Sequence, residues 1–117
     1  MSSEIQKTLE NIAHCSRLLD ETVVELGELD LEHVYAKSDA IVAYARAFMS
    51  SDGPMEVRKQ QSLLDTFQER LDEELAEAKL RACKARLQKL HAQLDMLRTI
   101  NAAQRAQFQA EPFGQYT

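Results

Sequence analysis

The feature that most constrains this chain is the absence of helix breakers from its second half. Between Pro54 and Pro112 there is neither glycine nor proline, and the segment is rich in Ala, Leu, Gln, Glu, Lys and Arg, which are strong helix formers. A helix over residues 54–110 would be roughly 80 Å long. A compact globule of this size is shorter than that, so the helix must bend or lie against an equally long partner.

The first half offers such a partner in two helical segments, which we predict at residues 4–26 and 31–50. Ser3 with Gln6 forms a capping box for the first helix, and Asp30 can cap the second. Gly27 separates them and predicts a kink in this arm. Apolar residues recur every three, four or seven positions along each helix: Ile5, Leu9, Ile12, Leu19, Val23 and Leu26, then Leu31, Val34, Tyr35, Ile41, Val42, Ala45, Phe48 and Met49.

The strongest turn signal is the segment Ser50–Pro54, because glycine tolerates unusual dihedral angles and proline is favoured at a helix start. We therefore predict an all-α fold, a long antiparallel, coiled-coil-like helical hairpin that reverses at this turn. A three-helix bundle with a bent third helix has nearly the same hydrophobic pattern and stays open as an alternative. Residues 1–111 would form the single domain, and residues 112–117 a C-terminal tail.

A heptad seam marks the third helix. Its members alternate steps of three and four residues: Leu80, Cys83, Leu87, Leu90, Leu94 and Leu97. A hairpin covers one stripe per helix and leaves other apolar side chains, such as Phe67 and Leu75, partly uncovered. Because oligomerisation is the usual way to cover such residues, we expect a homo-oligomer.

Charge is segregated along the chain. Residues 1–32 carry a net charge of −6, residues 33–78 of −4 and residues 79–117 of +5. In one explanation the hairpin lays the acidic first arm over the basic last helix. In the other, the basic residues bind the phosphates of a nucleic acid, which requires exposed Lys and Arg side chains. The candidates for that role are Lys79, Arg81, Lys84, Arg86, Lys89, Arg98 and Arg105.

Motifs of catalysis and metal binding are weak or missing. In the hairpin, residue i lies roughly opposite residue 105 − i, which would bring a possible zinc set of two Cys and two His near one another: His14, Cys15, Cys83 and His91. Because no CxxC or HxxxH pair is present, buried apolar roles for Cys15 and Cys83 are favoured over zinc. The acidic run from Glu69 to Glu77 is typical of a solvated helix face. Without a phosphate loop, a nucleophile elbow or a cofactor fingerprint, we expect a non-enzymatic protein with no metal and no cofactor.

The two ends of the chain lead to further expectations. Met1-Ser2-Ser3-Glu4 is unlike a secretory signal and no apolar run is long enough to span a membrane, so we expect a cytoplasmic protein with no membrane partner. At the other end, Phe113 and Tyr116 are candidate anchors of a short peptide that docks into a partner's pocket. A frayed end folded onto the hairpin is the alternative.

Three stretches carry a resemblance to a known group of proteins: Ala43–Met49, Gly53–Lys59 and Leu94–Asn101. Together they form a helix, a Gly turn with a Glu-x-Arg-Lys start, and a long Leu-rich helix. The chain thereby resembles small helical-hairpin accessory proteins of tailed bacteriophages and prophages. The resemblance implies a protein of the host cytoplasm that acts in phage DNA replication and recombination.

Three functions follow from these observations. The first is binding of single-stranded DNA or of a recombinase or replication protein through the basic last helix. The second is a helical adaptor or inhibitor that binds a host protein through the acidic first arm or the aromatic tail. The third is a structural assembly or scaffold protein.

Overall fold

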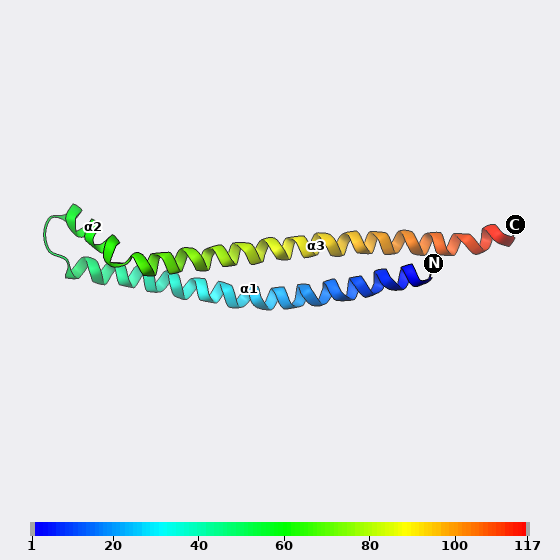
Figure 1. Cartoon of the computed structure of the whole chain (residues 1–117), viewed down its shortest axis with the longest axis horizontal. Helices are drawn as coiled ribbons and strands as arrows, with labels where there is room; N and C mark the ends of the chain where they lie inside the picture. The colour runs from blue at the N-terminus through cyan, green and yellow to red at the C-terminus, as the bar shows by residue number, and fades with distance from the viewer. Residues whose placement is uncertain (1, 117) are drawn as a thin grey trace. The chain divides into compact units, whose positions relative to one another are not determined.

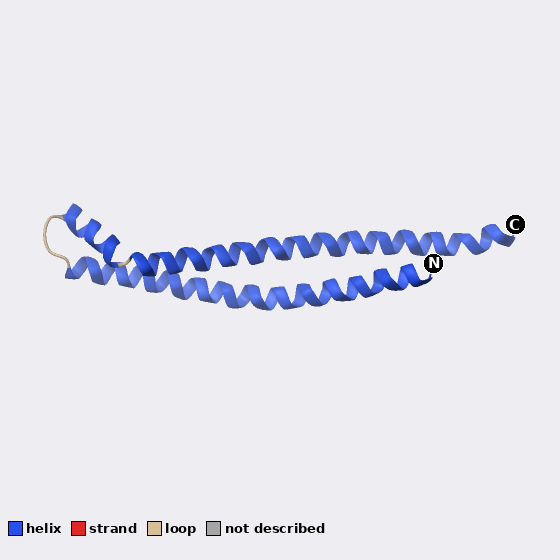
Figure 2. Cartoon of the chain, in the orientation of Figure 1, coloured by secondary structure: helices blue, strands red, loops and turns tan. Residues whose placement is uncertain are grey.

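The computed structural model describes the backbone of residues 2–116 and the side chains of residues 3–110. It contains three helices, α1 (Ser2–Ser50), α2 (Met55–Asp65) and α3 (Phe67–Tyr116), and the described backbone has no strand. Figure 2 shows that only the loop of residues 51–54 and the junction at Thr66 interrupt the helices. The predicted all-α helical hairpin is confirmed.

The chain divides into two compact units, which are described separately. Unit 1 comprises Met1–Val24 and Ala85–Thr117, and unit 2 comprises Glu25–Lys84. Unit 1 therefore joins the first part of α1 to the last part of α3. Unit 2 contains the rest of both helices, the loop and α2.

The break expected at Gly27 does not occur. Helix α1 runs without interruption from Ser2 to Ser50, so Asp30 lies inside a helix and caps nothing. A glycine within a helix costs about 1 kcal/mol relative to alanine, and the helical residues on either side outweigh that cost. Gly27 is exposed and has no positive φ angle, so its backbone is that of an ordinary helical residue.

The predicted turn is confirmed. Gly53 has a φ of 105°, a conformation that side-chain-bearing residues rarely adopt. Pro54 is the N-cap of α2 in an extended conformation, so α2 begins one residue later than predicted. At the same end of unit 2, the Arg58 guanidinium donates a hydrogen bond of 2.9 Å to the Phe48 carbonyl and lies 4.3 Å from the centroid of the Phe48 ring. These contacts attach α2 to the end of α1.

The long helix predicted over residues 54–110 is divided at Thr66, whose φ and ψ are −113° and 20°. The hydroxyls of Ser62 and Thr66 each donate a 2.7 Å hydrogen bond to the carbonyl four residues earlier, a pattern that bends helices. The Arg70 guanidinium donates to the Leu63 carbonyl at 2.6 Å and so bridges the junction. Figure 1 shows α2 at an angle to α3, so the third helical segment is bent rather than straight.

Helix α3 continues to Tyr116, beyond the end predicted at residue 110. Pro112 removes the hydrogen bond that its own N–H would donate to the carbonyl four residues earlier. Loss of one such bond weakens or bends a helix without having to end it.

The core of unit 1 is a cluster of leucines. Cys15 and Leu19 of α1 are buried with Leu90 and Leu94 of α3, and four half-buried residues pack against them: Ile12, Leu18, Leu87 and Leu97. The Cys15 thiol donates a 3.4 Å hydrogen bond to the Leu90 carbonyl, which agrees with the predicted hairpin register. Burial of each leucine contributes roughly 2 kcal/mol, so this cluster holds unit 1 together.

The core of unit 2 consists mainly of small side chains. Its buried residues are Ala40, Ser62, Thr66, Ala76, Leu80 and Cys83. Ala40 and Ala76 are only 4% and 3% exposed. These two alanines therefore occupy buried positions of the kind that larger apolar side chains usually fill between helices. Small residues allow helices to approach closely but remove less apolar surface from water than leucines do.

Candidate interaction surfaces

The seven basic residues predicted to contact nucleic acid are all exposed on α3. In unit 2, the Lys79 ammonium lies 3.3 Å from a carboxylate oxygen of Glu32 on α1, and the Arg81 guanidinium lies 3.9 Å from a carboxylate oxygen of Glu77. Exposed pairs of this kind contribute at most about 1 kcal/mol. The Lys79–Glu32 pair is one instance in which an acidic residue of the first arm faces a basic residue of the last helix.

These basic residues do not share one face of α3. Successive helical residues are about 100° apart, which divides the seven into three groups. Lys79 and Arg86 flank the leucine seam on one side, Lys84, Arg98 and Arg105 flank it on the other, and Arg81 and Lys89 lie on the outer surface. A ligand that follows one side of the helix would therefore meet only some of them.

The heptad seam lies in the interior of the hairpin. In unit 2, Leu80 and Cys83 are buried, and in unit 1 the four leucines of the seam belong to the leucine cluster described above. The seam is therefore used within one chain, and an oligomer would have to form through another surface.

Two further features are the zinc set that the sequence did not favour and the predicted docking tail. Cys15 and Cys83 are buried, whereas His14 and His91 are exposed. Among the described residues, no group of three or more His, Cys, Asp or Glu side chains could hold a metal ion. Phe113 and Tyr116 lie outside the described side chains, so their docking role stays a prediction. No helical stretch of the described chain combines the length and apolarity needed to cross a membrane.

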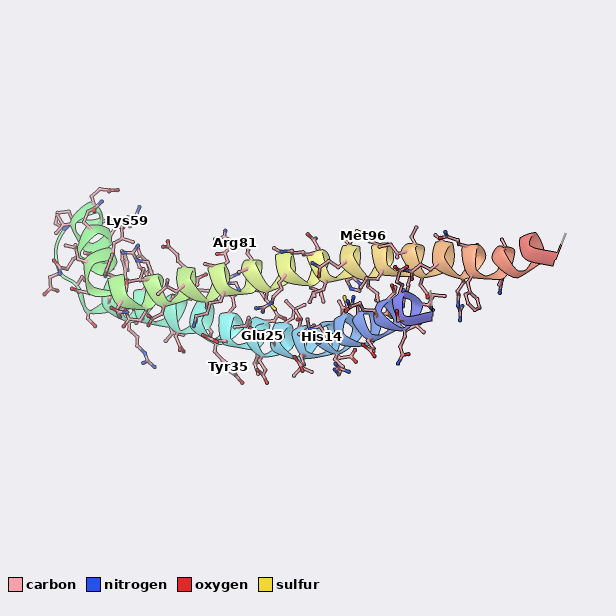
Figure 3. The ribbon with its side chains drawn as sticks, turned by 45° about the vertical axis from the view of Figure 1, so that its right-hand side comes forward. His14, Glu25, Tyr35, Lys59, Arg81 and Met96 are labelled. Atoms are coloured by element: carbon pink, nitrogen blue, oxygen red, sulfur yellow. The ribbon has the colours of Figure 1, made fainter. Side chains whose placement is uncertain are left out.

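A different surface stands out on α1 within unit 2, and we call it the outer face. Its large apolar side chains are Leu31, Val34, Tyr35, Ile41, Val42 and Met49, whose exposed fractions range from 43% for Val42 to 81% for Met49. Leu31, Tyr35, Val42 and Met49 follow heptad spacing, and Ser38 and Ala45 occupy the remaining heptad positions. Figure 3 shows Tyr35 on the side of α1 turned away from α3.

The inner face of the same stretch explains this exposure. Ala36, Ala40, Ala43 and Ala47 alternate steps of four and three residues, and each is buried or half-buried. In unit 2, α1 therefore turns these four alanines inward and the six large apolar residues of the outer face outward. The spacing of the apolar residues predicted the stripe but not which side of it faces the hairpin. The alanine spacing is the signal that could have revealed it.

An acidic groove adjoins the outer face. It is lined by Glu32, Tyr35, Ala36 and Asp39 of α1 and by Glu69 and Asp72 of α3. Four carboxylates around one tyrosine ring favour a positively charged side chain, because both the charges and the ring face attract a cation. Arg46 is exposed seven residues after Asp39, on the same side of α1.

In comparisons with protein-family models, curated proteins and solved structures, nothing matches this chain.

Proposed function

We propose that this chain is a non-enzymatic helical interaction protein that binds another helical surface through the outer face of α1. The observation that supports this proposal is the row of large apolar side chains exposed along Leu31–Met49, opposite a row of buried or half-buried alanines. Apolar residues repeated with heptad spacing are the pattern with which one helix packs against another. Exposed apolar patches with a polar rim are typical of protein-binding sites.

The test is photo-crosslinking from a reactive amino acid placed at position 42, in purified protein and in a lysate. We expect a protein adduct from this position because the side chain lies in the middle of the outer face. The matched control is the same probe at position 88, which is exposed on α3 and belongs to unit 1.

Ile41→Glu in the chain that carries the probe should remove the adduct, since a charge in the apolar row would have to be desolvated on docking. If position 42 gives no more adduct than position 88, the outer face is not a docking surface.

Nucleic-acid binding is the second candidate, and the observation that favours it is the exposure of all seven basic residues in a segment of net charge +5. Phosphate contacts predict an affinity that falls by orders of magnitude between about 50 and 200 mM salt. Titration of single-stranded and double-stranded oligonucleotides over this range tests the proposal. If reversal of Lys84, Arg86 and Lys89 to Glu leaves the affinity unchanged in a folded protein, these residues do not bind phosphates.

The wider biological setting stays a prediction. A phage accessory protein of the host cytoplasm could use the outer face for a recombinase, a replication protein or a host factor, and could use the basic residues for DNA. Loss of partner binding on deletion of residues 112–117 would assign that contact to the tail instead of the outer face.

A further inference from the structure

We propose that the partner on the outer face is a second copy of this chain, with the two α1 helices antiparallel. This inference rests on the proposed docking role of the outer face and identifies the molecule that occupies it. The two-fold axis would pass between Ser38 and Val42, at the centre of the exposed apolar row.

The sizes of the side chains favour this arrangement. With the axis in that position, Tyr35 lies opposite Ala45 of the second copy, Val42 opposite Ser38, and Leu31 opposite Met49. Large residues then meet small ones in the inner layers, which fills the interface without voids. A parallel pair in register would place Ser38 opposite Ser38 and Ala45 opposite Ala45. Two small side chains would then face each other in both layers and leave space unfilled. In the antiparallel pair, Ile41 of one copy also meets Ile41 of the other beside the axis.

The area of the outer face is sufficient for such a dimer. Each large apolar side chain offers roughly 100 Å², so the six offer about 600 Å² per copy. Two copies would together bury about 1,200 Å², the lower end of the range for specific protein interfaces. The alanine core of unit 2 leaves this surface uncovered within one chain.

The charges beside the outer face are also complementary. In the antiparallel pair, Arg46 of each copy approaches Glu32 of the other, at the acidic groove that Asp39, Glu69 and Asp72 also line. Two such contacts form in the symmetric dimer. One repulsive contact accompanies them, because the two Asp39 carboxylates face each other near the axis. A nucleic acid would be repelled by these carboxylates, so this surface favours a protein.

The first experiment measures molar mass by light scattering and sedimentation from about 1 to 100 µM, where specific dimers of moderate affinity assemble. We expect wild-type protein to be a dimer and Val42→Glu to be a monomer with unchanged helix content. Gln88→Glu, on the exposed side of α3, is the matched control and should remain dimeric. A wild-type monomer over the whole range would overturn the inference.

A charge exchange tests the predicted contact. Arg46→Glu should raise the dissociation constant about tenfold or more, since two attractive contacts become repulsive. The double variant Glu32→Arg with Arg46→Glu restores opposite charges in both contacts. It also removes the exposed Lys79–Glu32 pair within each chain, which contributes little, so it should recover most of the affinity. If the double variant is as weak as Arg46→Glu alone, the antiparallel contact is wrong.

Disulfide trapping tests the orientation. Chains with Leu31→Cys mixed with chains with Met49→Cys should form a 31–49 crosslink under mild oxidation. Chains with Leu31→Cys alone should not crosslink through position 31, because the two copies of that residue would lie about 27 Å apart along the helices. A 31–31 crosslink would contradict the antiparallel arrangement.

The outcome also separates this inference from the proposed function. If position 42 crosslinks to a different protein while the purified chain stays monomeric, the outer face is a docking surface but its partner is not a second copy. If position 42 crosslinks to nothing, both fail.

Discussion

Units 1 and 2 use the same two helices in opposite ways. In unit 1, leucines and a cysteine fill the space between α1 and α3. In unit 2, the buried residues are mainly small, and the six large apolar residues of the outer face of α1 are exposed. The difference shows that one amphipathic helix can turn its large apolar side chains towards its own hairpin along one stretch and towards the outside along another.

This contrast also assigns separate physical roles to the two units. The leucine cluster removes enough apolar surface from water to stabilise unit 1 within a single chain. The small-residue core of unit 2 removes less, and the exposed outer face offers further stabilisation only when something covers it. We therefore expect a smaller side chain to lower the stability of the unit 1 core, and a larger side chain to lower the stability of the unit 2 core.

The largest effect is expected from Leu90→Ala in unit 1. Loss of a buried leucine leaves a cavity and should lower the free energy of unfolding by about 3 kcal/mol. Urea denaturation followed by circular dichroism at fixed protein concentration measures it. Met96→Ala, at an exposed position of the same unit, is the control and should change stability by less than about 0.5 kcal/mol. Equal effects at the two positions would contradict a leucine core.

The reverse substitution tests unit 2. Ala76→Leu adds volume at a position that is almost fully buried, and should lower the free energy of unfolding by about 2 kcal/mol through overpacking. Ala78→Leu adds the same volume on the exposed side of α3 and should have little effect. If Ala76→Leu stabilises the protein in the same denaturation assay, the unit 2 core has room for large residues and the contrast between the units is lost.

The smallest effects concern the backbone of α1 and the turn. Gly27 is helical, and a β-carbon added there would meet no atom within 4 Å, so Gly27→Ala should raise stability by about 1 kcal/mol. Gly53→Ala should lower stability by a similar amount, because the φ of 105° strains any side-chain-bearing residue. Thermal unfolding of both variants provides the comparison. A loss of stability in Gly27→Ala would show that α1 is broken between Val24 and Leu31.

The surfaces were predicted unequally well. The sequence named the seven exposed basic residues, because charged side chains on a helix remain in water. Their positions on both sides of the leucine seam also follow from helical spacing. The spacing did not show that Lys79 and Arg81 have acidic partners. The sequence predicted the outer face only as part of an apolar stripe. The spacing of apolar residues shows that a stripe exists, but not which of two adjacent faces of the helix packs against the partner helix.

The sequence by itself determined the helical content, the reversal at Gly53 and Pro54, and the leucine seam of α3. These features depend on local backbone preference and on side-chain spacing within one helix. The tertiary structure decided that α1 continues through Gly27, that the second half bends at Thr66, and that the alanines of unit 2 face inward. The orientation of the alanines depends on how α1 packs against a segment distant in the sequence, which spacing within one helix does not show. The other two depend on hydrogen bonds along each helix: those of the neighbouring residues outweigh the small intrinsic preference of Gly27, and those of Ser62, Thr66 and Arg70 accompany the bend.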